Sequence, residues 1–233
     1  MIELSPVELT ALMLSIKVAF TALLFGLPIA IAVAWFLANK NFYGKAVIDG
    51  LIHAPLVLPP VIIGYLLLLG FGPNGVLGQF FENAFGLSFA FNWKGAALAS
   101  GIMAFPLMVR AIRLSFESQN AKLVHAANSL GASPIRAFFT ITLPLAFSGI
   151  ISGGILGFAR ALGEFGATIS FVASIPALTQ TLPLALYRAI ETPGAEESAF
   201  RLMLISLAIA MVALAMSEVL ARAVRRKQGG NGA

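Results

Sequence analysis

The sequence predicts an all-α integral membrane protein with about five transmembrane helices, and three observations carry this prediction. Hydrophobic residues make up 59% of the 233 residues and charged residues only 11%, and the mean hydropathy is +0.92. A soluble domain is about half apolar and about a quarter charged. The apolar residues also gather in segments near the roughly 20 residues that a helix needs to cross a bilayer core.

The first predicted span covers residues 12–37, within a helix that starts earlier in the chain. Ser5 suits the N-cap, Pro6 suits the first helical position, and Glu8 completes a capping box. Lys17 lies near the outer end of the span, where its long side chain can reach the interface.

The second predicted span covers residues 47–70 and contains Pro55, Pro59 and Pro60. Each proline removes a backbone donor and disturbs the preceding turn. Because a helix broken within lipid must satisfy its free carbonyls through protein or a wet cavity, this span is expected to face the protein interior. Residues 72–92 are predicted to form a polar loop.

The third and fourth predicted spans cover residues 95–112, with Pro106 inside, and residues 145–163, with a possible extension to Phe171. Small residues recur every four positions on one face of the fourth span, which permits close helix packing. They are Gly149, Gly153 and Gly157. Packing within the chain is the favoured interpretation, and a contact between subunits is the alternative.

Residues 173–198 are predicted to be a loop, and residues 200–220 a fifth span followed by a basic tail. Residues 1–228 are then one transmembrane domain, and residues 229–233 a disordered tail. Most of the 15 Lys and Arg residues fall on one set of span ends. The positive-inside rule places that set in the cytoplasm, which puts the N-terminus outside and the C-terminus inside.

Residues 119–144 form a cytoplasmic loop in this topology, with the order helix, glycine, helix and proline. Asn120 can cap a short helix that ends at a left-handed Gly131. Ser133 caps and Pro134 opens a second short helix. Pro144 is expected to end that helix at the preceding residue and to open the fourth span.

Small and apolar side chains make this loop suitable for contact with another protein; otherwise it folds against its own spans. The small residues are Ala126, Ala127 and Ala132, and the apolar ones are Phe138, Phe139 and Ile141. Elsewhere, Asp49 is expected to form a solvated pair with Lys45, and His53 to be an interior or interfacial residue.

The spacing of the loop resembles the EAA loop of ABC-importer permeases, which reads Glu-Ala-Ala, three residues, Gly, nine residues and Ile-x-Leu-Pro. The matching positions are Ala126, Ala127, Gly131, Ile141, Leu143 and Pro144. His125 stands where the family has Glu. The resemblance implies a coupling helix that docks in a groove of a separate ATPase subunit.

Four longer stretches, residues 56–67, 105–113, 138–144 and 161–168, are similar to the permease subunit of bacterial molybdate ABC transporters. This resemblance implies a type I ABC importer permease fold and a homodimer in the bacterial inner membrane. It also implies two cytoplasmic ATPase subunits and a periplasmic molybdate-binding protein as partners. Because residues 163–167 are shared with related permeases, a tungstate or sulfate/thiosulfate permease is the alternative.

Arg160 and Glu164 stand four residues apart at the end of the fourth span. An ion pair that fixes the helix end is one interpretation, and a place in the transport pathway is the other. Glycine amides and a threonine hydroxyl nearby can donate hydrogen bonds to a passing oxyanion. The candidate pathway residues are Pro59, Pro60, Gly163, Glu164, Gly166 and Thr168.

Other function classes receive little support. The chain has no cysteine and two distant histidines, His53 and His125, so no metal or other cofactor is predicted. It contains no Gly-x-x-x-x-Gly-Lys-Ser/Thr phosphate loop, so it is predicted not to be an enzyme and to take its energy from a separate ATPase. Its basic residues fit topology better than nucleic-acid binding. An ion-coupled secondary transporter needs paired carboxylates deep in its spans, which offer little beyond Glu164 and Glu218.

Overall fold

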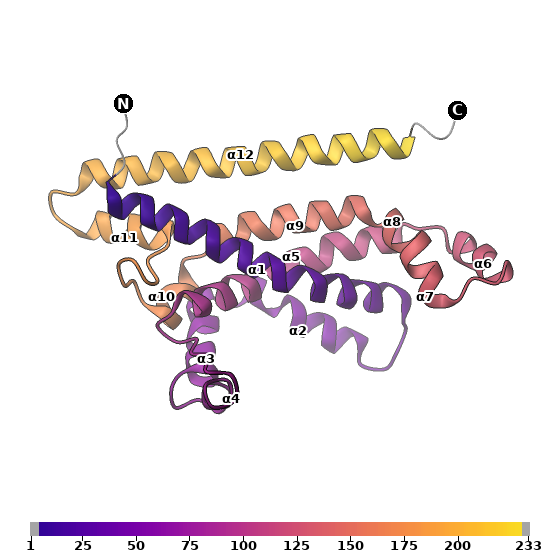
Figure 1. Cartoon of the computed structure of the whole chain (residues 1–233), viewed down its shortest axis with the longest axis horizontal. Coiled ribbons are helices and arrows are strands. Elements are labelled where there is room, and N and C mark those ends of the chain that lie inside the picture. Colours follow the sequence, from indigo (N-terminus) through magenta and orange to yellow (C-terminus); the bar gives the residue numbers. More distant parts are fainter. Residues whose placement is uncertain (1–4, 230–233) are drawn as a thin grey trace.

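The computed structural model describes the backbone of residues 5–229, and the side chains of that range except at 121, 214, 217, 218 and 220–229. Over these residues the chain is helical and contains no strand. The helices, in order, are α1 (Pro6–Asn39), α2 (Lys45–Val57), α3 (Pro60–Phe71), α4 (Val76–Phe85), α5 (Trp93–Glu117), α6 (Ala121–Ser129), α7 (Pro134–Ala137), α8 (Leu143–Leu145), α9 (Phe147–Leu162), α10 (Gly166–Val172), α11 (Leu182–Glu191) and α12 (Glu196–Gly229). The long helices α1, α5, α9 and α12 follow the long axis, with α6 and α7 at one end and α11 at the other (Figure 1).

The predicted all-α membrane fold is confirmed. Helices α1 and α5 are each long and apolar enough to cross a membrane. Two bent pairs pass the same test when joined: α2 with α3, which meet at 113°, and the segment from Pro134 to Leu145 with α9, which meet at 64°. The break that the prolines predict in the second span is therefore present, at Leu58 and Pro59. The predicted fifth span lies within α12, whose last side chains are outside the described set.

The start of α1 has the predicted capping box. The Ser5 hydroxyl accepts a hydrogen bond from the Glu8 amide at 3.3 Å, and the Glu8 carboxylate accepts one from the Ser5 amide at 2.8 Å. The same carboxylate accepts a hydrogen bond from the Ser198 hydroxyl at 2.7 Å and pairs with Arg201 at 3.2 Å. Glu8 therefore caps its own helix and also holds the first turn of α12 against it.

The glycines of α9 face α5 within the same chain, as predicted. A Cβ at Gly153 would lie 2.9 Å from Ile112, and one at Gly149 or Gly157 would collide with Ser115 or Met108. Only glycine lets the two backbones approach so closely. The core between α1, α5 and α9 is built around these contacts.

The segments at residues 72–92 and 173–198 both contain helices, so the expectation that they form loops was wrong in part. Helix α4 forms because Phe81 packs against Phe71 and Phe89, at 6.0 and 5.4 Å between ring centroids. Helix α11 buries Leu182 and Ala185 against α1 and α12. Its proline stands in the first turn, where a missing amide costs nothing.

The fourth span differs from its prediction at both ends. The backbone stays helical through Leu143 and Pro144. A π-helical turn over Phe138–Thr142 precedes them, and this wider turn accommodates the proline within the helix. The bend comes after Leu145, so α9 opens at Phe147 instead of at the proline. At its other end α9 stops at Leu162, and the possible extension to Phe171 is a separate helix, α10.

The expected pair of Asp49 with Lys45 was also wrong. Asp49 on α2 pairs with Arg113 on α5 at 2.9 Å, whereas Lys45 donates to Asn41 at 3.2 Å. His53, half-buried as expected, has its Nδ1 at 2.8 Å from the Asp49 carbonyl. The planar guanidinium of Arg113 pairs with this carboxylate across the two helices, and the pair ties α2 to α5.

Candidate functional site

The loop at one end of the molecule has the predicted helix, glycine, helix order. The Asn120 side chain accepts a hydrogen bond from the Lys122 amide at 3.0 Å and so caps α6. Gly131 takes a φ of +88°, a left-handed conformation that favours glycine. The Ser133 hydroxyl then accepts from the Arg136 amide at 3.3 Å, and Pro134 opens α7.

Two contacts fix the base of this loop to the rest of the chain. The Gln119 side-chain amide donates to the Thr142 carbonyl at 2.9 Å, which joins the start of the loop to its end. The Phe138 ring meets Trp35 of α1 edge to face, with centroids 5.5 Å apart. Phe138 is therefore an anchor and not a free contact surface, and Ile141 is half-buried as well.

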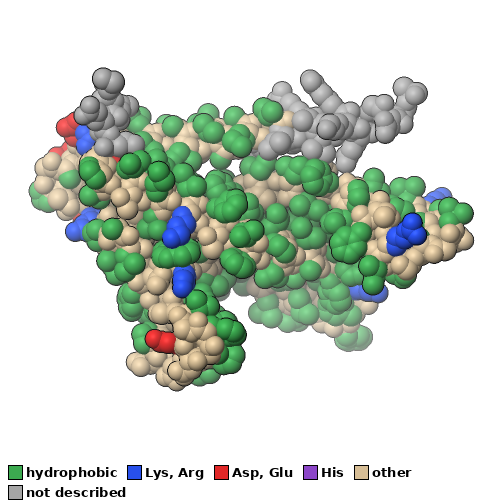
Figure 2. All heavy atoms as spheres, viewed as in Figure 1, with side chains coloured by type: hydrophobic (Ala, Val, Ile, Leu, Met, Phe, Trp, Pro, Cys, Tyr) green, Lys and Arg blue, Asp and Glu red, His purple; other side chains and the backbone are tan. Residues whose placement is uncertain are grey.

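The outer face of the loop exposes apolar side chains beside basic ones. Leu130 is 90% exposed, Ile135 73% and Phe139 61%. His125 and Ala126 are exposed too, and Lys122 and Arg136 flank them; Figure 2 shows basic side chains on this end of the molecule. Sequence reasoning missed Leu130 and Ile135, although an apolar residue on either side of a glycine turn in a polar loop is a usable signal.

The turn after α9 is organised by Glu164, whose side chain is almost fully buried. Its Oε1 accepts a hydrogen bond from the Ala167 amide at 2.8 Å, at the start of α10. Its Oε2 pairs with the Arg160 guanidinium at 2.6 Å. The predicted i,i+4 ion pair is thus present, and the carboxylate also caps the next helix.

The turn lies against the break in the second span. A Cβ on Gly166 would be 2.8 Å from the Pro60 ring, and one on Gly64 would collide with the Ala167 carbonyl. The structure therefore brings Pro60 and Gly166, two of the predicted pathway residues, into direct contact. Thr168 is fully buried, and its hydroxyl donates to the Phe165 carbonyl at 2.8 Å.

Helix α11 covers the same turn through an aromatic contact. The Phe165 ring packs on Tyr187 with centroids 4.9 Å apart. A hydrogen bond to the Glu191 carboxylate raises the pKa of the Tyr187 phenol. Among the described residues, no group of three or more His, Cys, Asp or Glu side chains could hold a metal ion.

One straight helix joins the two candidate regions. Helix α9 has 16 residues, so it is about 24 Å long at the usual helical rise. It begins two residues after Leu145, at the end of the loop, and ends two residues before Glu164. Figure 1 shows the loop and the turn at opposite ends of the helical bundle.

This arrangement is the type I ABC importer permease fold. The structure is similar to a chain of a bacterial alginate ABC transporter in complex with an alginate-bound periplasmic protein, with a TM-score of 0.74, 18% identity, and coverage of 94% of this chain and 80% of that one. It is also similar to a chain of the inward-facing MetNI methionine ABC transporter, with a TM-score of 0.68, 14% identity, and coverage of 93% and 94%.

The family follows from the sequence comparison. The model of the binding-protein-dependent transport system inner membrane component family matches residues 26–226, and the chain belongs to this family. It is thus a membrane transport permease and not an enzyme. The chain is 56% identical over 222 residues to the molybdenum transport system permease protein ModB of Haemophilus influenzae, covering 95% of this chain and 97% of the relative. The ModB protein of Escherichia coli is 54% identical with the same coverage, and a putative molybdenum permease of Bacillus subtilis, YvgM, is 39% identical over 78% of this chain and 81% of the relative.

Proposed function

We propose that this chain is the membrane-spanning subunit of an ATP-driven molybdate importer. One structural observation carries the mechanism: an exposed helix, glycine, helix loop is joined by a single helix, α9, to a buried turn at a break between spans. The anion is inferred from the relatives, since permeases named for molybdenum transport match nearly the whole chain at more than half identity. Tungstate or sulfate/thiosulfate transport remains the alternative to be tested.

The proposed partners follow from what the chain lacks and what it exposes. The sequence has no phosphate-binding loop motif, so ATP must be bound by another subunit. The exposed Leu130, Ile135 and Phe139 offer that subunit apolar contacts, and the neighbouring His125 and Ala126 extend the same face. A second copy of this chain and a periplasmic molybdate-binding protein complete the proposed assembly.

The proposed topology places the loop of residues 119–144 in the cytoplasm, the N-terminus in the periplasm and the C-terminus in the cytoplasm of a bacterium. ATP binding would draw two ATPase subunits together and move the two loops with them. Helix α9 would carry that movement to the turn at Glu164. Transport is then a switch between two rigid-body arrangements that bind ATP with different affinity.

The proposed pathway runs beside the contact between α3 and α10. One span is broken at this contact, at Pro59 and Pro60, and the turn from Gly163 to Phe165 after α9 packs against that break. Broken backbone at membrane depth is tolerated where protein or a water-filled cavity surrounds it. Gly163, Gly166 and the ion pair of Glu164 with Arg160 would let an oxyanion pass without holding it.

The test is molybdate-stimulated ATPase activity in liposomes. The chain is co-reconstituted with its cognate ATPase and supplied with the binding protein, with sulfate and tungstate as competitors. Gly131→Pro should abolish stimulation, because proline cannot adopt the φ of +88° that the loop requires. Binding of the purified anion-loaded binding protein should be retained.

The matched control is Gly194→Pro. Gly194 has a φ of +82° in the connection between α11 and α12, at the opposite end of the molecule. It makes the same backbone demand away from the ATPase, so stimulation should persist. Equal loss in both variants would mean that the effect is general misfolding. Transport without ATP or without the ATPase would refute the proposed function.

A further inference from the structure

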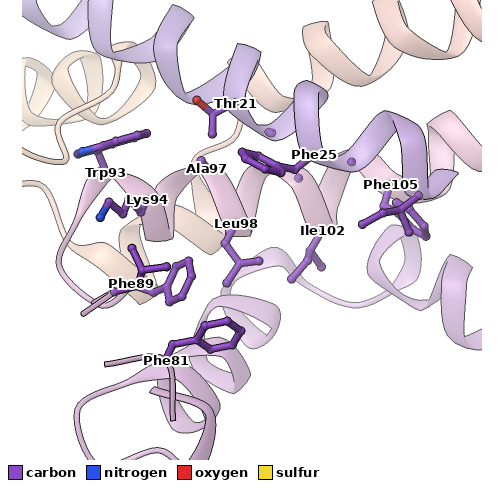
Figure 3. A pocket seen from close by; sticks show the side chains of 15 residues that line it. Thr21, Phe25, Phe81, Phe89, Trp93, Lys94, Ala97, Leu98, Ile102 and Phe105 are labelled. Carbon is purple, nitrogen blue, oxygen red and sulfur yellow. The ribbon is translucent and has the colours of Figure 1, made fainter. Parts of the chain in front are cut away.

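A groove runs along the contact between α1 and α5 and is separate from both candidate regions. It has a volume of about 600 Å³, and nearly all of its wall is apolar. Figure 3 shows Leu98 and Ile102 of α5 pointing into it, Phe25 of α1 above, and Phe81 of α4 on the far side. At mid-helix, Gly101 of α5 stands opposite Ala22 of α1, so the floor is made of small residues.

Two lysines and a tryptophan stand at one end of this groove. The Lys17 ammonium lies 3.7 Å from the centre of the Trp93 ring, in a cation–π contact. Lys94 is the next residue on α5 and lines the groove itself. Within the part of the chain that the structure describes, neither ammonium has a carboxylate within 4.0 Å.

The length and the apolar wall of the groove suit a hydrocarbon chain. From Trp93 to Phe105 the groove follows one face of α5 for about 18 Å. Its wall is apolar along this length, as an acyl chain requires.

We propose that this groove is a binding site for one anionic phospholipid, with an acyl chain along α1 and α5 and its phosphate at Lys94 and Lys17. The charge at the mouth decides the headgroup, because two ammonium groups with no carboxylate nearby among the described residues attract a phosphate to the end of an apolar channel. Trp93 is suited to the membrane interface, where its ring has one apolar and one polar side. Phe81 closes the groove from α4, so a bound lipid would also hold α4 against the bundle.

Trp93 makes the proposal measurable. The chain has two tryptophans, so Trp35→Phe leaves Trp93 as the only one. This full-length protein is reconstituted in vesicles that contain phosphatidylcholine and phosphatidylglycerol, one of which carries bromine on its acyl chains. Bromine quenches tryptophan fluorescence on contact. Quenching measured over a series of ratios of the two lipids therefore gives their relative occupancy beside Trp93.

We expect phosphatidylglycerol to be preferred by at least about five-fold, which is the effect of one lysine near a lipid phosphate. Lys94→Gln should lower the preference several-fold, and Lys94→Arg should retain it. Lys40→Gln is the matched control, since Lys40 is an exposed lysine at the other end of α1 and should change nothing. Ile102→Phe, which fills the groove, should reduce quenching by both lipids.

Two results would overturn the proposal. Equal quenching by the two lipids would mean that Trp93 meets only bulk membrane. No quenching by either lipid, with quenching restored on dilution of the protein in the vesicles, would mean that a second copy of the chain covers the groove. If Lys94→Gln fails to give a monodisperse protein, Lys17→Gln and a salt titration of the wild-type protein replace it. The preference for phosphatidylglycerol should fall in both measurements, and a preference that neither of them changes would overturn the proposal.

Discussion

Replacing Gly153 by alanine tests the close packing of α9 on α5. The added Cβ would lie 2.9 Å from an Ile112 side-chain carbon and 3.1 Å from the Met108 carbonyl oxygen. The carbonyl belongs to the backbone and cannot rotate away, so the helices must separate. Overpacking of this kind costs about 1–3 kcal/mol, and alanine recovers up to about 1 kcal/mol of helix propensity.

The next residue supplies a matched control. A Cβ on Gly154 would meet nothing closer than 3.7 Å, which is an ordinary contact with Leu27. Gly154→Ala therefore keeps the gain in helix propensity without the collision. The propensity term cancels between the two variants, so their difference is the overpacking cost itself, about 1–3 kcal/mol.

The assay is thermal unfolding of each variant in the same detergent, followed by tryptophan fluorescence. For a chain of this length, 1 kcal/mol corresponds to about 2–4 °C in Tm. A cost of about 2 kcal/mol therefore places Gly153→Ala about 4–8 °C below Gly154→Ala. Equal melting temperatures, or a lower one for Gly154→Ala, would refute the packing of this glycine face against α5.

Two further pairs of variants compare a buried with an exposed partner of Arg201, and the anchoring Phe138 with the exposed Phe139. Glu8→Gln should cost about 1–3 kcal/mol in unfolding free energy because Glu8 is a buried partner of Arg201. Glu197→Gln removes the 88% exposed partner of the same arginine and should cost less than about 1 kcal/mol; denaturant titration in micelles compares the two. Phe138→Ala should lower the melting temperature, because that ring is the loop's anchor, whereas Phe139→Ala, which loses only an edge contact with Phe138, should lower it by less. Phe139→Ala should instead weaken ATPase association by about ten-fold, measured by co-purification at graded concentrations.

Features set by neighbouring residues could be predicted from the sequence. The capping box at Ser5 and Glu8, the left-handed Gly131 and the cap at Ser133 all depend on contacts three or four residues long. The Arg160–Glu164 pair has the same short range. A periodic glycine pattern likewise indicated a close helix contact, because its geometry follows from the helical repeat alone.

Features set by distant residues could not be predicted. Asp49 has a lysine four positions away, but it pairs with an arginine 64 residues along the chain. The contact between Pro60 and Gly166 is of the same kind. Helices α4 and α11 were missed because their prolines and glycines are turn signals, and only packing against other segments decides that they mark helix ends instead.

The contacts of the buried Glu164 explain how α9 transmits movement in the proposed coupling. A helix transmits a displacement only if both of its ends are fixed to what they move. At one end of α9, Gln119 and Phe138 fix the loop to its own base and to α1. At the other, the two oxygens of Glu164 hold Arg160 of α9 and the Ala167 amide of α10, so these helices move together about the turn at Gly163. Because α10 has no free space against α3 at Gly166, movement of α9 must either shift α3 or open that contact.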